Sequence, residues 1–507
     1  MIFTKNIIFF CKLILLQILF RYIIIEENVL IGVIFVSIAD FAASAVKAIS
    51  KHNAKKLKRK SSAPPISKHN VKKFTGDKYV VGFSSCEVMP DDIDTATYWI
   101  AGHGPGKKIE GVHDPITVSA MWISCGENGG IMMISADIIG LTRVEVAVVR
   151  DKLSEFSKKI NCKSTNICCT HNHAGFDTVG YWGKLPRTGK NPAYMDKLLN
   201  SMVNVCHEAY ENRTEGDLYV GSVHVPEAQF DKRLPTVLHD VLTRIRFVPD
   251  NGSDETWFLN YAAHPNTLGG GNRQVSADYP YYLRKTINEA RKTNVLFGIG
   301  AIAAVDPGDF CEDKVERTRI QGECLGKAAL SIDNDRKLDC KISVLRQPYY
   351  CPVDNGVLAF LALLKVMSTK RYPCDKGELG LALKTEMTYI YLGDQKILLL
   401  PGESFPETVY GGYAAADESA TGKGPEINPT PLIEIAGDDN LLVFGVTNDM
   451  TGYVVAPNDF ILHKTQAYLS NGRDRFDRSH YHETNSLGYL ASQTIADVFE
   501  DIVKRME

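Results

Sequence analysis

The sequence predicts a mixed α/β protein with a single large domain, residues 76–507, in which mixed β-sheets are flanked by helices. First, short apolar runs typical of strands alternate with longer segments of helical periodicity along this region. Second, no repeat, low-complexity tract or further linker interrupts it. Third, 44% hydrophobic and 23% charged residues exclude a disordered chain and a small disulfide-stapled protein.

The expected elements follow one another in a regular order. A turn signal, Glu127-Asn-Gly-Gly130, predicts that residues 116–124 and 130–136 form a strand pair. Apolar residues at helical spacing predict helices at residues 142–159, 195–210, 279–292, 315–332 and 487–506. Further strands are expected at residues 165–170, 218–225, 242–248, 256–262 and 397–400.

Residues 1–46, before this domain, are predicted to be a signal peptide or a membrane anchor. Residues 29–39 form an apolar run followed by small residues up to Ala45, which is the shape of a signal-peptide core and cleavage site. The other apolar run, residues 7–25, contains a lysine and an arginine, and a charge at a bilayer centre costs about 2.5–3.5 kcal/mol. A long export signal, an uncleaved anchor and a start codon misplaced upstream of an ordinary signal all stay open. Each of these three possibilities predicts that residues 76–507 lie outside the cytosol, either secreted or anchored to a membrane.

Residues 47–75 are predicted to be a basic linker. Residues 47–73 contain ten Lys or Arg residues and no acid, and Pro64 and Pro65 disfavour a helix there. The segment is either a solvated spacer or, beside a retained anchor, a contact for anionic lipid at the membrane surface. Because the apolar front is neutral and the whole chain carries −3, the rest of the protein carries −13. We therefore expect no nucleic acid among its partners.

A pair of histidines is the sharpest local feature. Thr170-His-Asn-His-Ala-Gly175 directly follows a predicted strand, and residues two apart on an extended chain project to the same side. His171 and His173 together could begin a zinc site, or one could bind metal while the other transfers protons. The alternative is two surface histidines in a loop.

Three further strand ends offer ionisable groups. His264 ends an apolar strand before Pro265, although it could also be a satisfied core histidine. Glu403 follows a buried strand and Gly402, and Tyr453 is presented by a polar turn after another apolar run. Two imidazoles and a carboxylate suit the borderline character of zinc, and a catalytic zinc needs three or four protein ligands.

Together and in this order, the motifs resemble those of the neutral/alkaline non-lysosomal ceramidase family, which are zinc-dependent amidohydrolases. The matching segments are Val80-Val-Gly-Phe-Ser-Ser-Cys-Glu-Val-Met-Pro90, His113-Asp-Pro-Ile116, Ile134-Ser-Ala-Asp-Ile-Ile-Gly140, Thr170-His-Asn-His173, Ala262-Ala-His264, Leu400-Pro-Gly-Glu403 and Asn448-Asp-Met-Thr-Gly-Tyr453. They span nearly all of residues 76–507, and we expect the catalytic domain without the C-terminal β-sandwich of the longer family members.

The resemblance implies a role for each matching residue. One zinc ion would be held by four ligands: His171, His264, Glu403 and Tyr453. His173 would be the general acid/base, Tyr481 would steady the oxyanion, and Arg233 would contact the substrate. The implied reaction is hydrolysis of the amide bond of ceramide or a related N-acyl lipid, releasing a fatty acid and a sphingoid-type amine. Asp137 is either a partner that orients a ligand histidine or a structural residue.

The chain departs from the family pattern near the site. Ala174 and Phe176 replace a Ser and a Pro, and Cys311 stands where a substrate-contacting Ser is usual. Other N-acyl lipids, smaller amides and a non-catalytic surface protein that keeps a degenerate site therefore stay open. A nucleophile-based hydrolase using Cys311 or Ser404 is a further alternative, although Ser404 lacks a nucleophile-elbow motif.

The run at residues 357–367 is apolar except for Lys365 and is too short to span a bilayer. We expect it in the core, or lining an entrance for lipid.

Overall fold

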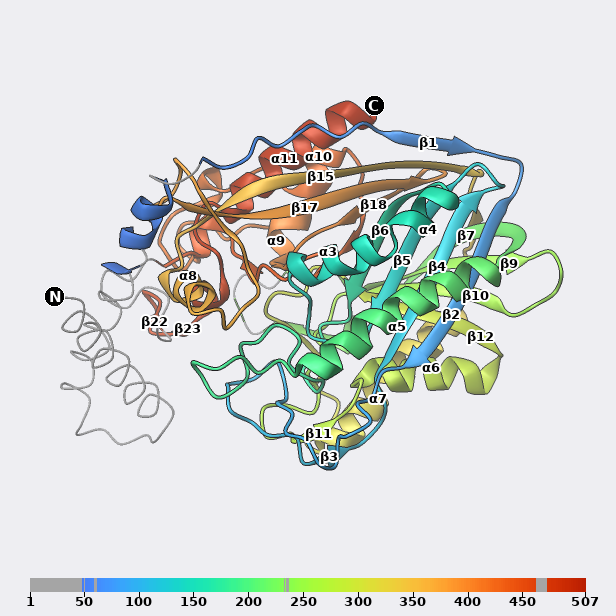
Figure 1. Ribbon diagram of the computed structural model, residues 1–507, viewed down its shortest axis with the longest axis horizontal. Helices are drawn as coiled ribbons and strands as arrows, with labels where there is room; N and C mark the ends of the chain where they lie inside the picture. The colour runs from blue at the N-terminus through green and yellow to red at the C-terminus, as the bar shows by residue number, and fades with distance from the viewer. Residues whose placement is uncertain (1–47, 50, 59–61, 232, 234–236, 462–471) are drawn as a thin grey trace.

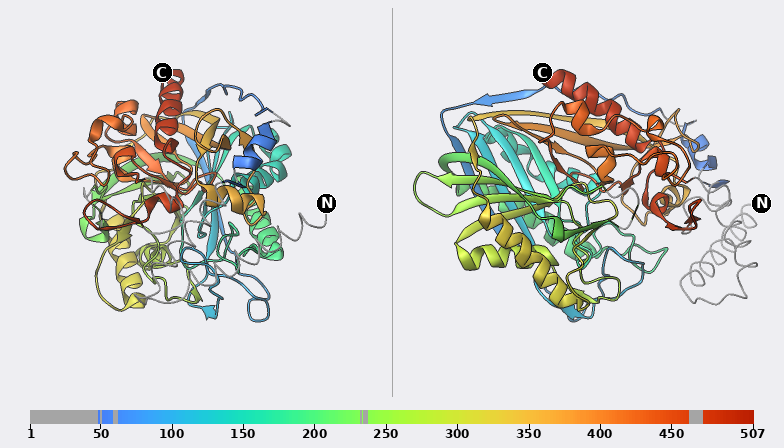
Figure 2. Two further views of the ribbon diagram at one scale, coloured as in Figure 1. Left: turned by 90° about the vertical axis from the view of Figure 1, so that its left-hand side faces the viewer. Right: turned by 180° about the vertical axis from the view of Figure 1, so that it is seen from behind.

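The structure is a computed structural model that describes residues 48–49, 51–58, 62–231, 233, 237–461 and 472–507 (Figure 1). Its centre consists of two β-sheets packed face to face, and helices cover the outer face of each sheet (Figures 1 and 2). The predicted class, mixed sheets flanked by helices, is confirmed.

The larger sheet has nine strands. In spatial order they are β12 (Thr293–Ile299), β10 (Glu255–Tyr261), β9 (Val241–Pro249), β7 (Thr214–His224), β2 (Tyr79–Glu87), β4 (Thr117–Cys125), β5 (Gly130–Ala136) and β6 (Cys162–Cys169), with β14 (Arg336–Lys337) beside β7. The pairs β5–β6 and β10–β12 are parallel and the others are antiparallel. The predicted strand pair joined at Glu127–Gly130 is β4 and β5.

Helices cover the outer face of this sheet. They are α3 (Arg143–Lys152), α4 (Ser154–Lys159), α5 (Pro192–Glu211), α6 (Tyr279–Ala290) and α7 (Lys314–Ser331). Their boundaries follow from capping: Asn191 accepts a hydrogen bond from the Tyr194 amide, and Asp313 accepts one from the Glu316 amide. The helix predicted over residues 142–159 is interrupted at Leu153, which ends α3 and precedes α4.

The second sheet has six strands. They are β1 (Lys72–Thr75), β15 (Lys341–Val353), β17 (Leu381–Leu392), β18 (Gln395–Leu399) and β20 (Leu442–Phe444), with β16 (Arg371–Pro373) beside β17. Its long antiparallel pair β15–β17 was not among the predicted strands, and in β15 Pro348 and Pro352 argue against a strand. Both prolines lie beyond the reach of β1, where β15 is an edge strand and a missing N–H is tolerated.

Period-two alternation gives this sheet two apolar faces. On β17, Ile390 and Leu392 join the core between the sheets, whereas Met387 and Tyr389 join the outer core. Three helices complete the outer layer: α9 (Pro406–Tyr410), α10 (Leu432–Ala436) and α11 (Ala491–Met506). The helix α8 (Gly356–Leu363) belongs to the long connection between β15 and β17.

Shorter elements complete the chain. They are β3 (Gly111–Val112), β8 (Gln229–Asp231), β11 (Gln274–Val275), β13 (Val305–Pro307), β19 (Glu403–Ser404), β21 (Tyr453–Val454), β22 (Gly472–Arg473), β23 (Ser479–His480), and the single turns η1 (Pro226–Ala228), η2 (Pro425–Ile427), η3 (Pro457–Asp459) and η4 (His482–Asn485).

The described part of the basic segment is not a free linker, which corrects the prediction. Residues 51–58 are helical, and Ala54 is buried in the outer core of the second sheet. The Pro64 carbonyl accepts a hydrogen bond from Tyr350, and β1 pairs with β15 before the predicted domain boundary at residue 76. The segment therefore contributes a helix and a strand to the fold.

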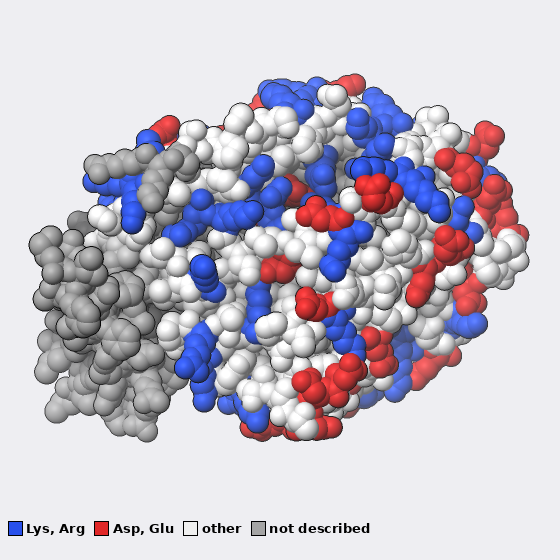
Figure 3. Space-filling model, in the orientation of Figure 1, with Lys and Arg blue, Asp and Glu red and all other residues white. Residues whose placement is uncertain are grey.

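The surface and the termini bear on the predicted membrane association. Basic and acidic side chains are interspersed on the face seen in Figure 3. Among the described residues, no helix combines the length and apolarity needed to cross a bilayer. The apolar residues 1–46, predicted to be a signal or an anchor, lie outside this part of the chain.

Candidate metal centre and active site

The two sheets meet at one end, and the predicted site lies there. The Cys169 amide at the end of β6 donates to the Val446 carbonyl, and the Val446 amide donates to the Gly402 carbonyl. The Ala303 amide, in the connection that follows β12, donates to the Ser404 carbonyl. These crossing hydrogen bonds fix the segments that follow β6 and β18, which carry His171 and Glu403, and His264, after β10, is fixed by its amide, which donates to the Val305 carbonyl.

His171, His264 and Glu403 converge on one point. The Nε2 atoms of His171 and His264 each lie 3.1 Å from Oε2 of Glu403. All three residues are at most 4% exposed. Ligands about 2.0–2.1 Å from a tetrahedral zinc lie about 3.4 Å from one another, so these separations fit ligands that share one cation.

Backbone carbonyls orient the two imidazoles. Nδ1 of His171 lies 2.7 Å from the Ile139 carbonyl oxygen, and Nδ1 of His264 lies 2.9 Å from that of Val305. Since a carbonyl can only accept, each Nδ1 carries a proton, and each Nε2 is the nitrogen left to bind a metal. Asp137 instead pairs with Arg284 at 2.6 Å and accepts from Thr117, so its suggested role in orienting a ligand histidine is wrong.

The donor set fits a zinc ion. Burial alone would raise the pKa of Glu403, but His171 and His264 lower it to about 2, so the carboxylate is ionised. A metal ion would displace the protons that the two imidazoles share with Glu403, and the resulting Nε2 lone pairs and carboxylate are ligands that zinc accepts. His173 is an alternative nitrogen donor, since candidate ligand atoms of His171, His173 and His264 lie within 4.8 Å of one another. The 3.1 Å contacts favour the set that contains Glu403.

Tyr453 is placed beside Glu403 by the parallel pairing of β19 and β21, in which these two residues are direct partners. Gly402 makes the turn that allows this: its φ is +76°, and a Cβ there would lie 2.4 Å from the Gly452 carbonyl oxygen. Burial, with Glu403 and Tyr481 as neighbours, raises the pKa of Tyr453 well above its usual value, so without a bound cation the hydroxyl is protonated.

His173 lies beside the convergence point without a hydrogen-bond partner of its own. Both ring nitrogens are buried and unpaired among the described residues. Its ring centroid is 4.8 Å from that of His171 and 5.4 Å from that of His264. Burial, then the neighbouring His171, His264 and His103, lower the pKa of His173 well below its usual value, so the free imidazole is neutral. A neutral imidazole can accept a proton.

His103 is a residue that the sequence reasoning missed. Its ring centroid is 5.1 Å from that of His173, and it lies in an irregular glycine-rich loop that carried no motif. The neighbouring Gly102 has a φ of +95°, and a Cβ there would lie 2.3 Å from the His173 ring. This close approach of the backbone holds His173 against His171.

Tyr481 and Arg233 lie on a second side of the site. The Tyr481 ring faces Tyr453 at 6.4 Å between centroids and is 36% exposed. Arg233 lies over the Phe405 ring at 3.9 Å and pairs with Glu407 at 2.9 Å and Asp231 at 3.0 Å. The structure thus brings Tyr481 to the predicted site, whereas the Arg233 guanidinium is held by two carboxylates.

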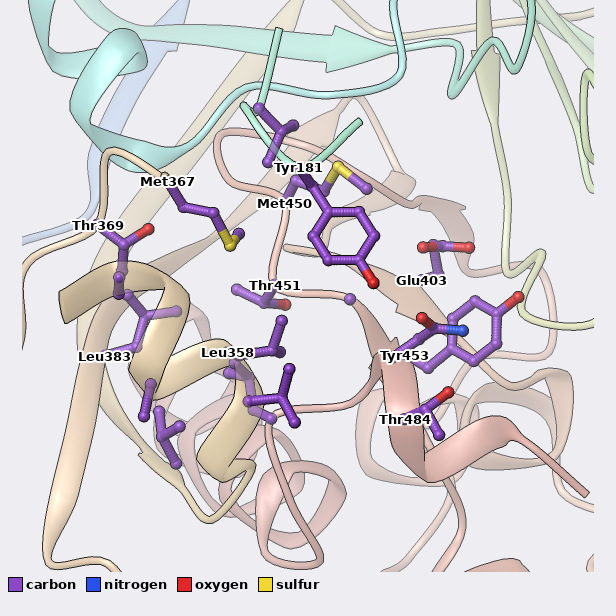
Figure 4. A pocket seen from close by; sticks show the side chains of 18 of the residues that line it. Tyr181, Leu358, Met367, Thr369, Leu383, Glu403, Met450, Thr451, Tyr453 and Thr484 are labelled. Atoms are coloured by element: carbon purple, nitrogen blue, oxygen red, sulfur yellow. The ribbon is translucent and has the colours of Figure 1, made fainter. Parts of the chain in front are cut away.

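Two cavities reach the site from different sides. An apolar cavity of about 320 Å³ has His171, His173, Glu403 and Tyr453 at one end. Its other end is apolar, with Leu358, Met367 and Leu383 lying away from Glu403 and Tyr453 in Figure 4. The Tyr181 hydroxyl points into the space between them (Figure 4). A polar cavity of about 730 Å³ is lined by residues that include His103, Arg233, Asp306, Arg317, Tyr481 and His482.

The alternative nucleophiles do not form a catalytic pair. Cys311 Sγ lies 3.4 Å from the Asp313 carbonyl oxygen, and the Ser404 hydroxyl is buried without a partner among the described residues. Neither forms a hydrogen bond with a described histidine. A nucleophile needs a base within hydrogen-bond reach, so this geometry gives no support to either residue.

Comparison with known proteins shows which solved structures share this fold. No protein-family model matches the chain, and no curated protein matches it. The neutral ceramidase from Pseudomonas aeruginosa is similar with a TM-score of 0.64 at 14% identity, over 84% of this chain and 74% of that one. A ceramidase complexed with C2 gives 0.63 at 13% identity, over 84% and 75%. The chain therefore has a neutral ceramidase-like fold.

Proposed function

We propose that the protein is a zinc-dependent amidohydrolase that cleaves the amide bond of an N-acyl lipid such as ceramide. One observation carries the proposal: the Nε2 atoms of His171 and His264 meet at one Glu403 oxygen, at the end of an apolar cavity. The fold of solved neutral ceramidases supports the same reaction class. Tyr453 beside Glu403 is the proposed fourth ligand.

Each group at the site has a separate role in the proposed reaction. A zinc ion bound there supplies Lewis-acid chemistry, which polarises a carbonyl and makes water a stronger acid. His173, neutral and unpaired, accepts a proton from the attacking water and delivers it to the leaving amine, without which the amide bond would not break. The Tyr481 hydroxyl, beside Tyr453, donates to the oxygen on which negative charge develops.

The apolar cavity suits an acyl chain. A volume near 320 Å³ lies at the lower end of the range of about 300–1,000 Å³ usual for small-molecule sites. Its wall includes Val357, Leu358 and Ala362 of α8, together with Met367, so the apolar run 357–367 lines an entrance for lipid in this proposal. The wider polar cavity beside Tyr481 accommodates the amine-bearing half of the substrate.

The departures from the family pattern lie outside these cavities. Phe176 is 1% exposed and packs against Tyr98 and Tyr194, with ring centroids 5.3 and 4.5 Å away. Ala174 is equally buried, and Cys311 lines neither cavity. The replacements therefore alter the packing behind the site and leave the walls of both cavities as a fit for a lipid amide.

The test is hydrolysis of a ceramide with a fluorescent acyl chain by the purified full chain. Chelation is expected to abolish turnover, and stoichiometric Zn²⁺ is expected to restore it. His171→Ala should lose the zinc of this centre together with turnover, whereas the exposed His207→Ala on α5 should keep both. Turnover that persists after complete zinc removal would refute the metal-dependent mechanism. Zinc binding with no turnover of long-chain, short-chain or soluble amides would favour the non-catalytic alternative.

A further inference from the structure

A second cluster of histidines and a carboxylate lies in the wall of the polar cavity, outside the centre described above. Asp459 ends η3, His480 ends β23, and His482 begins η4. His480 is 4% exposed and His482 is 5% exposed, and 14% of the Asp459 side chain is accessible. Asp459, His480 and His482 all line the polar cavity, so small solutes can reach them.

The three side chains approach one another as ligands of one cation do. One candidate ligand atom from each residue lies within 4.8 Å of the other two. Nδ1 of His482 lies 3.1 Å from Oδ2 of Asp459, the same separation as between His171 and Glu403. The two imidazole centroids are 4.4 Å apart. Two ligands of a tetrahedral ion lie about 3.4 Å apart, so small rotations would complete such a set.

Glu483 prepares His480 for this role. Its Oε1 atom lies 2.8 Å from Nε2 of His480 and also accepts the Ile461 amide. An ionised carboxylate only accepts, so Nε2 of His480 carries a proton and Nδ1 is the nitrogen left for a metal. A histidine whose second nitrogen donates to a carboxylate is the usual arrangement of a metal ligand.

Arg233, a described cation near the cluster, is held mainly by other carboxylates. Arg233 lies 3.9 Å from Oδ2 of Asp459, whereas its closest partners are Glu407 and Asp231. The cluster is also distinct from the first centre. Phe405 packs between them, with its ring 5.0 Å from that of His482 and 5.8 Å from that of Tyr453. No residue belongs to both donor sets.

We propose that Asp459, His480 and His482 form a second metal site, which takes a divalent transition-metal ion such as Zn²⁺. Two imidazoles and one carboxylate are ligands of borderline character, which such ions accept more readily than Mg²⁺ or Ca²⁺ does. The ion would tie η3 to the segment 480–482 and so hold Tyr481, which lies between the two histidines, against Tyr453. The proposal uses none of the residues of the amidohydrolase centre and stands independently of it.

The test counts zinc ions per chain. The full chain is saturated with Zn²⁺, freed of excess and analysed for metal, and two equivalents are expected. His171→Ala combined with His264→Ala should leave one, and His480→Ala combined with His482→Ala should also leave one. His207→Ala is the matched control and should keep two. One equivalent in the unmodified chain that persists in the His480/His482 double variant, or two equivalents in that variant, would overturn the proposal.

A milder variant covers the case in which the double variant does not fold. Asp459→Asn keeps the size of the side chain and an oxygen that can accept from His482, but it removes the charged ligand. Its affinity for the second equivalent of Zn²⁺ should fall by about tenfold or more, while the first is unchanged. Co²⁺ gives an independent readout, because its visible absorption should be built from two additive sets, one of which is lost in Asp459→Asn. An unchanged second affinity and an unchanged Co²⁺ spectrum would mean that the cluster is a hydrogen-bonded network without metal.

The outcomes separate this proposal from the amidohydrolase proposal. Two equivalents of zinc without amide turnover would leave the second site standing and remove the proposed reaction. One equivalent that depends on His171, with turnover, would do the reverse.

Discussion

His173 has the environment of a proton carrier more than that of a ligand. It touches the rings of His171, His264 and His103, but Glu403 bonds the first two of these and not His173. His173→Gln should therefore lower kcat by about 10²–10⁴-fold. Zinc content should stay at the value of the unmodified chain, because the ligands of the first centre are untouched. Loss of zinc together with activity would identify His173 as a ligand, in line with the alternative donor set.

Gly402 sets the direction of Glu403 through a backbone conformation that other residues rarely adopt. With φ at +76° and a Cβ 2.4 Å from the Gly452 carbonyl oxygen, Gly402→Ala introduces both strain and a clash. We expect a loss of about 2 kcal/mol or more in the free energy of unfolding, together with weaker zinc binding. Urea unfolding and zinc titration measure these two effects. Gly104→Ala, where a Cβ meets nothing within 4 Å, is the matched control and should change neither.

Glu255 makes one strand sensitive to acid. It begins β10 and accepts from Arg246, Arg291 and the Trp257 indole. Burial alone would raise the pKa of Glu255, but Arg246 and Trp257 lower it to about 2. Because the folded pKa lies below the unfolded one, the stabilisation is present above pH 4.5 and is lost as the pH falls towards 2.

Glu255→Gln measures that contribution. After allowance for solvent screening, the unfolding free energy should fall by about 1–2 kcal/mol at pH 7. The difference between the two proteins should shrink as the pH is lowered and should be small near pH 2–3. A difference that is independent of pH would show that the effect comes from packing and not from the charge.

At the scale of elements, the proposed reaction gives α8 the role of selecting the acyl chain. Leu358 lines the apolar cavity, whereas Leu363 on the same helix does not. Leu358→Asn should raise KM for a long-chain amide by about tenfold, since burying an unpaired amide costs about 1–3 kcal/mol. A short-chain amide should be hydrolysed as before, and Leu363→Asn is the control. Equal effects on both chain lengths would indicate that α8 supports the fold and does not contact the acyl chain.

Much of the site was predictable because its residues follow strands that carry a clear apolar signal. His171, His264 and Glu403 follow β6, β10 and β18 within a few residues. Because β6 and β10 lie towards opposite edges of one sheet and β18 belongs to the other, strand signals alone did not show that the three residues meet, and the family resemblance supplied that expectation. The β15–β17 pair was not predictable, because its prolines are acceptable only where β1 ends, and that depends on a distant segment. The place of His103 beside His173 depends on the conformation of a loop, and the environment of Arg233 depends on carboxylates that are distant in sequence. Neither could be predicted from the sequence.

At the scale of the whole molecule, the sequence before residue 76 is part of the folded protein. Phe74 on β1 is 9% exposed and belongs to the core between the sheets. A chain that begins at residue 62 lacks the helix 51–58 and the buried Ala54 but keeps β1, so it should lose less stability than one that begins at residue 76, which should lose about 2–4 kcal/mol relative to the full chain. Urea unfolding of the two chains decides this. Equal free energies of unfolding for the two chains would support a domain boundary at residue 76.

The proposed ligands of the first centre come from both sheets: His171 and His264 follow strands of the nine-stranded sheet, and Glu403 follows β18 of the other. An ion bound there would join the two sheets, because the complete set of ligands exists only when the sheets have packed against each other. The concentration of free zinc would then affect thermal stability, since an ion present at 100 times its dissociation constant raises the free energy of unfolding by about 2.7 kcal/mol. Without zinc, the contact between the two sheets at this end would be weaker, and the proposed lipid cavity beside it would be less rigid.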